Sequence, residues 1–189
     1  LAAPLPKECL RMQATNISHA SGQHAAQDAS SLQAWEHLAQ RAMQLSLNGK
    51  TESALALQIK ALQVAARLLA GPLLHAHPDH CMAAWVVSHH NIAQLLEQRQ
   101  QRVLALDYLC DAHIGLSSIE SAQATTPEVQ QAALRHLRET RGALLQWQCR
   151  HGSSACIDAA LRAPMPGQAD SACFAPSTPS IRYPSGHLH

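Results

Sequence analysis

The chain has 189 residues, which suits one compact domain with tails and a hydrophobic core of its own. Its formal net charge is only +1 with neutral His, so it lacks the basic excess with which proteins usually bind nucleic acid or anionic lipid. We therefore expect neither a nucleic-acid partner nor a membrane partner. Ala, Leu and Gln dominate, whereas the strand-favouring Val, Ile, Tyr and Phe are scarce, and this balance predicts an all-α fold.

The cysteines and the apolar segments indicate the compartment. No apolar run approaches the ~20 residues of a membrane span, and no secretory signal is visible. No CxxC pair occurs, and three cysteines lie in helix-like segments, which favours reduced thiols over a disulfide framework. We therefore expect a cytoplasmic protein. The six cysteines are Cys9, Cys81, Cys110, Cys149, Cys156 and Cys173.

Helical periodicity begins after a mixed, polar segment over residues 1–30, within which residues 6–13 suggest a short helix. Over residues 31–49, apolar residues recur at three- and four-residue steps, and Gly49 supplies the stop. Residues 51–72 predict a second helix, capped by Thr51 and closed by Gly71 and Pro72.

Four further helices follow a His-rich loop at residues 75–81. The pattern predicts helices over residues 82–98, 103–118, 127–150 and 154–162, with a turn at 99–102. Thr126 is a natural N-cap because Pro127 occupies the first helical position, where its missing donor costs nothing. Residues 164–189 are rich in Pro, Ser and Gly and predict a flexible tail, which leaves residues 31–163 as one helical domain.

Two of the predicted helix pairs repeat one spacing of small and apolar residues. In each pair an Ala is followed at offsets of three, seven, twelve and nineteen by residues of matching type. The two series are Ala42, Leu45, Gly49, Ala54, Ala61 and Ala93, Leu96, Gln100, Ala105, Ala112. This spacing resembles the tetratricopeptide repeat, whose helix–turn–helix unit needs small residues where its helices cross. The resemblance implies antiparallel helical hairpins stacked as a short array of about six helices.

The resemblance covers residues 35–70 and 86–118 and departs from the family pattern in several places. Gln100 stands where the family favours Gly, and Gln58 stands where it favours a large apolar residue. The units lie 51 residues apart, which exceeds the family period, and the last helix pair does not fit the spacing. A generic α-helical bundle with an Ala-rich sequence is therefore the alternative fold.

A stacked array implies a protein–protein interaction module with an adaptor or regulatory role. Its groove is lined by the first helix of each pair and suits a peptide or a partner helix. The polar residues Asn91, Gln94 and Gln98 are the candidates for partner binding. The segment over residues 71–85 and the tail offer surfaces for self-association into a homo-oligomer.

The stretch "HAHPDHC" predicts a rival function, the binding of zinc or another transition metal. His75, His77, His80 and Cys81 offer imidazole and thiolate ligands within one segment. The predicted hairpin also brings His89 and His90 level with Cys110, and His113 lies one turn further along. The competing interpretation is a set of hydrogen-bonded core histidines and small buried thiols.

The remaining charged residues carry no catalytic signature. Arg135, Arg138 and Arg141 recur at three-residue steps, but Glu139 interrupts them and no aromatic residue is interleaved. We expect a solvated helix face there. Neither a P-loop nor a nucleophile elbow is present, so we do not expect an enzyme, and we expect no cofactor.

Overall fold

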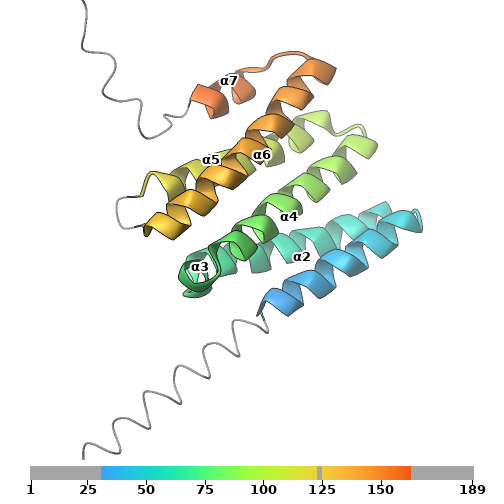
Figure 1. Cartoon of the computed structure of the whole chain (residues 1–189). Coiled ribbons are helices and arrows are strands. Elements are labelled where there is room, and N and C mark those ends of the chain that lie inside the picture. The colour runs from blue at the N-terminus through green and yellow to red at the C-terminus, as the bar shows by residue number, and fades with distance from the viewer. Residues whose placement is uncertain (1–30, 123–124, 163–189) are drawn as a thin grey trace, which may run out of the picture.

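The computed structural model describes residues 31–122 and 125–162, and within these ranges the chain is all helical with no β-strand (Figure 1). This confirms the predicted all-α fold. The helices are residues 31–47, α2 (Thr51–Ala70), α3 (Leu73–Ala76), α4 (Pro78–Gln98), α5 (Arg102–Glu120), α6 (Pro127–His151) and α7 (Ala155–Arg162). The predicted helix over residues 6–13, the predicted tail, Cys9 and Cys173 lie outside the described residues.

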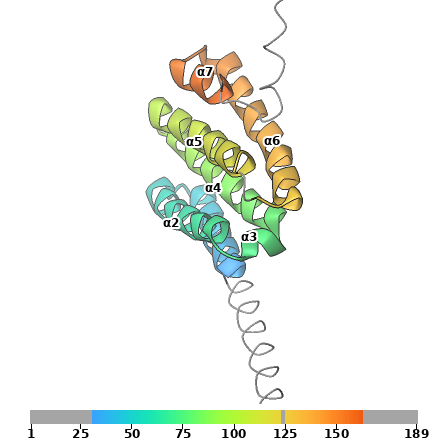
Figure 2. The same ribbon diagram turned by 90° about the vertical axis from the view of Figure 1, so that its left-hand side faces the viewer.

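Helix α4 lies at the centre of the packed helices. It packs against α2 on one side and α5 on the other, and α6 packs against both α4 and α5 (Figures 1 and 2). The helix over residues 31–47 also reaches α4, because Trp35 Nε1 donates a hydrogen bond to Ser88 Oγ at 2.9 Å. The helices therefore form a layered stack in which α4 and α6 are neighbours.

The turns after residues 31–47 and after α4 have the same backbone geometry. Gly49 has φ +71° and Gln100 has φ +61°, so both residues occupy the left-handed region. In each turn this residue donates to the carbonyl three positions back, and the next residue donates to the carbonyl five positions back, at 2.9–3.0 Å. These two bonds make the Schellman motif that ends many helices. The predicted stop at Gly49 and the predicted turn at 99–102 are therefore confirmed.

Small residues line the seams where the paired helices cross. The six alanines of the repeated spacing are all buried, with exposed fractions of 0–3%. Alanine at a crossing lets two helices approach closely, because its side chain adds only one carbon to the backbone. They are Ala42, Ala54, Ala61, Ala93, Ala105 and Ala112.

Two of the predicted caps have different outcomes. Thr126 caps α6 as predicted, since its side chain accepts a hydrogen bond from the Val129 amide. The prediction for Thr51 was wrong: Thr51 is the first residue of α2, and Lys50 precedes it without a side-chain cap. Helix α2 ends at Ala70, directly before the predicted closing residue Gly71.

The His-rich segment is helical, which corrects the predicted loop at 75–81. Residues Leu73–Ala76 form α3, and α4 begins at Pro78, four positions before the predicted start at residue 82. Pro78 suits the first turn of a helix, since the amide hydrogen that it lacks would be unpaired there in any case. The proline therefore lies in the first turn of α4 and not in a loop.

Helix α2 is long and apolar enough, by length and composition alone, to cross a membrane. This differs from the expectation that no segment would qualify. In the structure α2 packs against α4, and its buried face includes Ala61, Ala65 and Leu68. One face of the same helix is therefore part of the core.

Candidate functional site

A cavity of about 540 Å³ opens between α4 and α6, and we call it the α4–α6 groove. Side chains at three- and four-residue steps on each helix line it, because such steps return to one helix face. Leu109 of α5 also lines it. The lining residues are His90, Ala93, Gln94, Glu97, Gln98, Leu109, Ala143, Gln146, Trp147 and Arg150.

The wall formed by α6 combines an aromatic ring with a cation. Trp147 is only 3% exposed, so most of its ring belongs to the core. The guanidinium of Arg150 lies over this ring, 5.6 Å from the ring centroid, which is within range of a cation–π interaction. The ring and the cation therefore hold this wall in one geometry.

Ion pairs close the groove at the carboxyl end of α4. Glu97 Oε1 accepts hydrogen bonds from Arg150 Nη1 at 2.9 Å and from His151 Nε2 at 2.8 Å. Burial raises the pKa of Glu97, but the His151 hydrogen bond and the Arg150 charge outweigh it and hold the pKa below its usual value. Glu97 is therefore ionised and paired at neutral pH.

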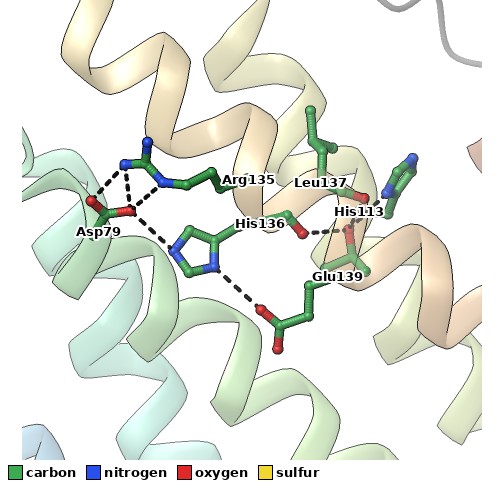
Figure 3. A network of polar contacts seen from close by, with 7 residues as sticks. Asp79, His113, Arg135, His136, Leu137 and Glu139 are labelled. Atoms are coloured by element: carbon green, nitrogen blue, oxygen red, sulfur yellow. Dashed lines mark hydrogen bonds and ion pairs between the residues drawn. The ribbon is translucent and has the colours of Figure 1, made fainter.

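A second polar network joins the amino-terminal part of α4 to α6 (Figure 3). Arg135 Nη2 donates to both carboxylate oxygens of Asp79, at 2.8 and 2.6 Å. His136 lies between two carboxylates, with Nε2 3.7 Å from Asp79 and Nδ1 3.4 Å from Glu139. The Arg135 hydrogen bond lowers the pKa of Asp79. Ion pairs therefore fasten α4 to α6 towards both ends of α4.

His90 lines the end of the groove that lies away from Glu97. Its Nε2 atom is buried, and no hydrogen-bond partner for it occurs among the described residues. Burial lowers the pKa of His90, so its ring is neutral at pH 7. A neutral imidazole one turn from the Gln94 amide makes this end of the groove polar and uncharged.

The structure places two of the three predicted partner-binding residues in this groove. Gln94 and Gln98 line it, whereas Asn91 is half-buried and is not among the lining residues. The sequence prediction missed the contribution of α6, in particular Gln146, Trp147 and Arg150. Their three- and four-residue spacing was visible, but only the packing of α6 against α4 shows that they face Gln94.

The structure does not bring the predicted metal ligands together. Among residues 31–122 and 125–162, no group of three or more His, Cys, Asp or Glu side chains has an arrangement that could hold a metal ion. His75 lies in α3, His77 precedes α4, and His80 lies in the first turn of α4. Cys81 is fully buried in the core beside α2. The rings of His77 and His80 lie near each other, with centroids 5.7 Å apart, but the buried Cys81 thiol does not join them in a group of three ligands.

Two histidines of the second predicted ligand group are buried and have other partners, whereas His90 of that group lines the groove. His89 is 2% exposed, and its Nδ1 donates to the Trp85 carbonyl at 2.9 Å. His113 Nδ1 forms a hydrogen bond of 2.8 Å with Thr140 Oγ1. Burial lowers the pKa of both histidines. This geometry matches the competing interpretation of core histidines.

The cysteines correct a further expectation. Cys110 of α5, which the metal hypothesis used as a ligand, is paired with Cys156 of α7 as a disulfide. Reduced thiols were expected because no CxxC pair occurs, but the two residues lie 46 positions apart and only the docking of α7 on α5 brings them together. Cys149 is free and exposed.

The arginine stripe of α6 is divided between two roles. Arg135 forms the ion pair with Asp79, whereas Arg138 and Arg141 are exposed, as expected of a solvated helix face. The stripe therefore does not act as one basic surface.

Comparison with known proteins identifies a family but no activity. No curated protein and no solved structure matches the chain significantly. One family model, described as "Protein of unknown function (DUF2753)", matches residues 33–167. The match includes every helix from α2 to α7. Because it covers more than half of the sequence, the chain belongs to the DUF2753 family.

Proposed function

We propose that the protein is an interaction module whose α4–α6 groove binds an extended peptide segment of a partner protein. The observation that carries this proposal is the groove itself, with a volume of about 540 Å³. Pockets of about 300–1,000 Å³ are typical of binding sites in proteins. Helices α4 and α6, which bear it, pack against each other and are also joined by ion pairs, so the groove is preformed.

The polar chemistry of the groove supports a peptide ligand. Gln94, Gln98 and Gln146 each carry an amide that both donates and accepts hydrogen bonds, as a peptide backbone requires. The charges of Glu97 and Arg150 are paired with each other. An uncharged segment therefore fits better than a strongly acidic or basic one, and we expect binding to depend only weakly on salt.

The first hairpin adds apolar surface on the equivalent helix face. Met43 and Leu47 lie 51 residues before Gln94 and Gln98, and they are 55% and 75% exposed. Large apolar side chains exposed in this way are typical of binding surfaces. We therefore expect the partner segment to combine backbone hydrogen bonds at the glutamines with apolar side chains towards Met43 and Leu47.

The resemblance to the tetratricopeptide repeat supports the same proposal. In such arrays the first helices of successive hairpins line the surface that receives a peptide. Here α4 follows the first hairpin and is the first helix of the second, and α6 follows that hairpin. The proposed site therefore uses the surface that the resemblance implies.

A peptide display experiment tests the proposal. The full chain is used to select peptides from a random library, and the selected peptides are measured against two matched tryptophan variants. Gln94→Trp fills the groove, whereas Gln63→Trp makes the same change at an exposed glutamine of α2, outside the groove. We expect Gln94→Trp to weaken binding at least tenfold and Gln63→Trp to leave it unchanged.

Two outcomes would contradict the proposal. One is a selection that yields no peptide above background although the protein is folded. The other is a set of selected peptides whose affinity is the same for both variants, because the binding surface would then lie elsewhere.

A further inference from the structure

Helix α7 is held to the rest of the molecule by few contacts. It has eight residues, and its fully buried side chains are Ile157 and Ala160. Isolated helices of this length are unstable in water, so α7 depends on what it packs against. Ile157 and Ala160 belong to the same core cluster as Leu109 and Trp147.

The polar contacts of α7 do not fasten it to other helices. Ser154 caps its first turn by accepting from the Ile157 amide, and Arg162 donates to the Asp158 carbonyl. Ser153 donates to the Asp158 carboxylate. In the part of the chain that the structure describes, the hydrogen bonds of α7 thus all run within residues 153–162.

One covalent link adds to this docking, the bond between Cys110 and Cys156. The Cα atoms of the two residues are 6.7 Å apart, which lies within the usual disulfide range of about 4.4–6.8 Å. Cys110 is 1% exposed on α5, whereas Cys156 is half-buried on α7. The bond therefore joins a buried thiol of the core to a more accessible thiol of the last described helix.

We propose that Cys110 and Cys156 form a redox-modification site. Its oxidant is a low-molecular-weight disulfide such as oxidised glutathione, and the disulfide bond that results holds α7 against α5. In the reduced state α7 is held only by apolar packing, that of the buried Ile157 and Ala160 and of the partly buried Leu161, and opens readily. In the oxidised state the link keeps Ile157 and Ala160 close to the core surface even when α7 unfolds locally.

The oxidation proceeds in two balanced exchange steps. The thiolate of Cys156, the more accessible residue, attacks one sulfur of the small disulfide, which forms a mixed disulfide and releases one small thiolate. The Cys110 thiolate then attacks Cys156 Sγ, which forms the protein disulfide and releases the second small thiolate. The protons of the two protein thiols end on the two released thiols. The protein loses two electrons and the small disulfide gains them.

Peptide mapping tests the bond directly, because Lys or Arg residues separate all six cysteines in the sequence. Trypsin places Cys110 on residues 103–135, Cys156 on 151–162 and Cys149 on 142–150. The full chain is equilibrated with oxidised and reduced glutathione at several ratios, free thiols are alkylated, and the digest is analysed by mass spectrometry. We expect peptide 103–135 linked to 151–162 under oxidising conditions, and both peptides alkylated under reducing conditions.

Hydrogen–deuterium exchange tests the effect on α7. We expect the amides of residues 155–162 to exchange on the order of tenfold faster or more in the reduced protein. The variant Cys156→Ser should show the fast rate under both conditions. The matched variant Cys149→Ser removes an exposed free thiol and should respond to glutathione as the unmodified protein does.

Three results would overturn the proposal. They are the absence of the 103–135/151–162 cross-link at every glutathione ratio, a cross-link of Cys110 to another cysteine, and equal exchange of residues 155–162 in the oxidised and reduced protein.

Discussion

The first hairpin, residues 31–47 with α2, and the second, α4 with α5, share one backbone turn but carry different side chains at equivalent positions. Equivalent positions lie 51 residues apart, as Gly49 and Gln100 do. The first hairpin has Ala34, Leu38, Gln58, Leu62 and Val64 where the second has Trp85, His89, Leu109, His113 and Gly115. The turn and the alanine seam thus specify a hairpin, whereas the other positions fit each hairpin to its own neighbours.

The largest expected effect concerns the closest contact in the second hairpin. A Cβ atom added at Gly115 would lie 2.9 Å from the Trp85 ring, so this glycine is needed for close approach. We expect Gly115→Val, which copies the first hairpin, to lower the free energy of unfolding by about 3 kcal/mol in urea denaturation.

Two variants sharpen this test. In the double variant Trp85→Ala/Gly115→Val the clash is absent. Its decrease in the free energy of unfolding should therefore be smaller, by at least ~1 kcal/mol, than the sum of the decreases in the two single variants. Gly142→Ala places a methyl group where nothing lies within 4 Å, and we expect it to stabilise α6 by up to about 1 kcal/mol. If Gly115→Val lowered the free energy of unfolding equally with Trp85 present and with Trp85→Ala, the proposed contact between position 115 and the Trp85 ring would be contradicted.

The second expected effect is a dependence on pH that only the second hairpin carries. Burial lowers the pKa of His89 and His113 below the ordinary value of 6.5, so just below pH 6.5 the unfolded chain binds more protons than the folded chain. The free energy of unfolding should therefore fall as the pH decreases from 6.5 to 5, by up to about 1.4 kcal/mol per pH unit for each group.

Leucine variants that copy the first hairpin check the origin of this dependence. His89→Leu and His113→Leu should each flatten the decrease, as measured by denaturation at pH 7, 6 and 5. If the free energy of unfolding of the double variant His89→Leu/His113→Leu depended on pH as steeply as that of the unmodified protein, other groups would be the cause of the dependence. His90 has a lowered pKa as well, so a residual slope is expected.

The third effect concerns a buried amide of the first hairpin. Gln58 is 2% exposed, and its Oε1 atom has no hydrogen-bond partner among the described residues, whereas the second hairpin has Leu109 there. Removing an unpaired buried polar group is favourable, so we expect Gln58→Leu to raise the free energy of unfolding by about 1–2 kcal/mol. The reverse change, Leu109→Gln, should lower it. Destabilisation by Gln58→Leu would indicate that the amide has a partner in solution.

The smallest effect compares the two turns themselves. Gln100 holds a left-handed conformation that costs a residue with a side chain about 1–2 kcal/mol, whereas glycine adopts it freely. We expect Gln100→Gly to stabilise the protein by about 1 kcal/mol and Gly49→Ala to destabilise it by a similar amount. Nothing lies within 4 Å of a Cβ atom at Gly49, so only the backbone can account for a loss there. Changes of the same sign in both variants would contradict the equivalence of the turns.

Local spacing was sufficient to predict much of this fold. The helix faces, the stop at Gly49, the cap at Thr126 and the alanine seams each depend on residues within about one hairpin. The start of α4 was misplaced because Pro78 is acceptable both in a loop and in the first turn of a helix. Single-residue preferences could not decide between the two.

The candidate site was less accessible to prediction, because it depends on helices that are distant in sequence. Gln94 and Gln98 were found from the exposed stripe of α4, but Trp147 and Arg150 join them only through the packing of α6. The pairing of Cys110 with Cys156 likewise requires the orientation of α7 on α5. The histidines suggested a metal site because their spacing is short, but helix geometry turns neighbouring side chains in different directions.

Site-specific photo-crosslinking tests most directly whether the α4–α6 groove is the binding surface. A benzophenone-bearing amino acid replaces Gln98, the exposed last residue of α4 at the edge of the groove, in one sample and Gln63 in the other, and each is irradiated with a peptide selected by display. We predict covalent capture of the peptide from position 98 and none above background from position 63. Capture from position 63 alone, or equal capture from both positions, would contradict the assignment of the groove.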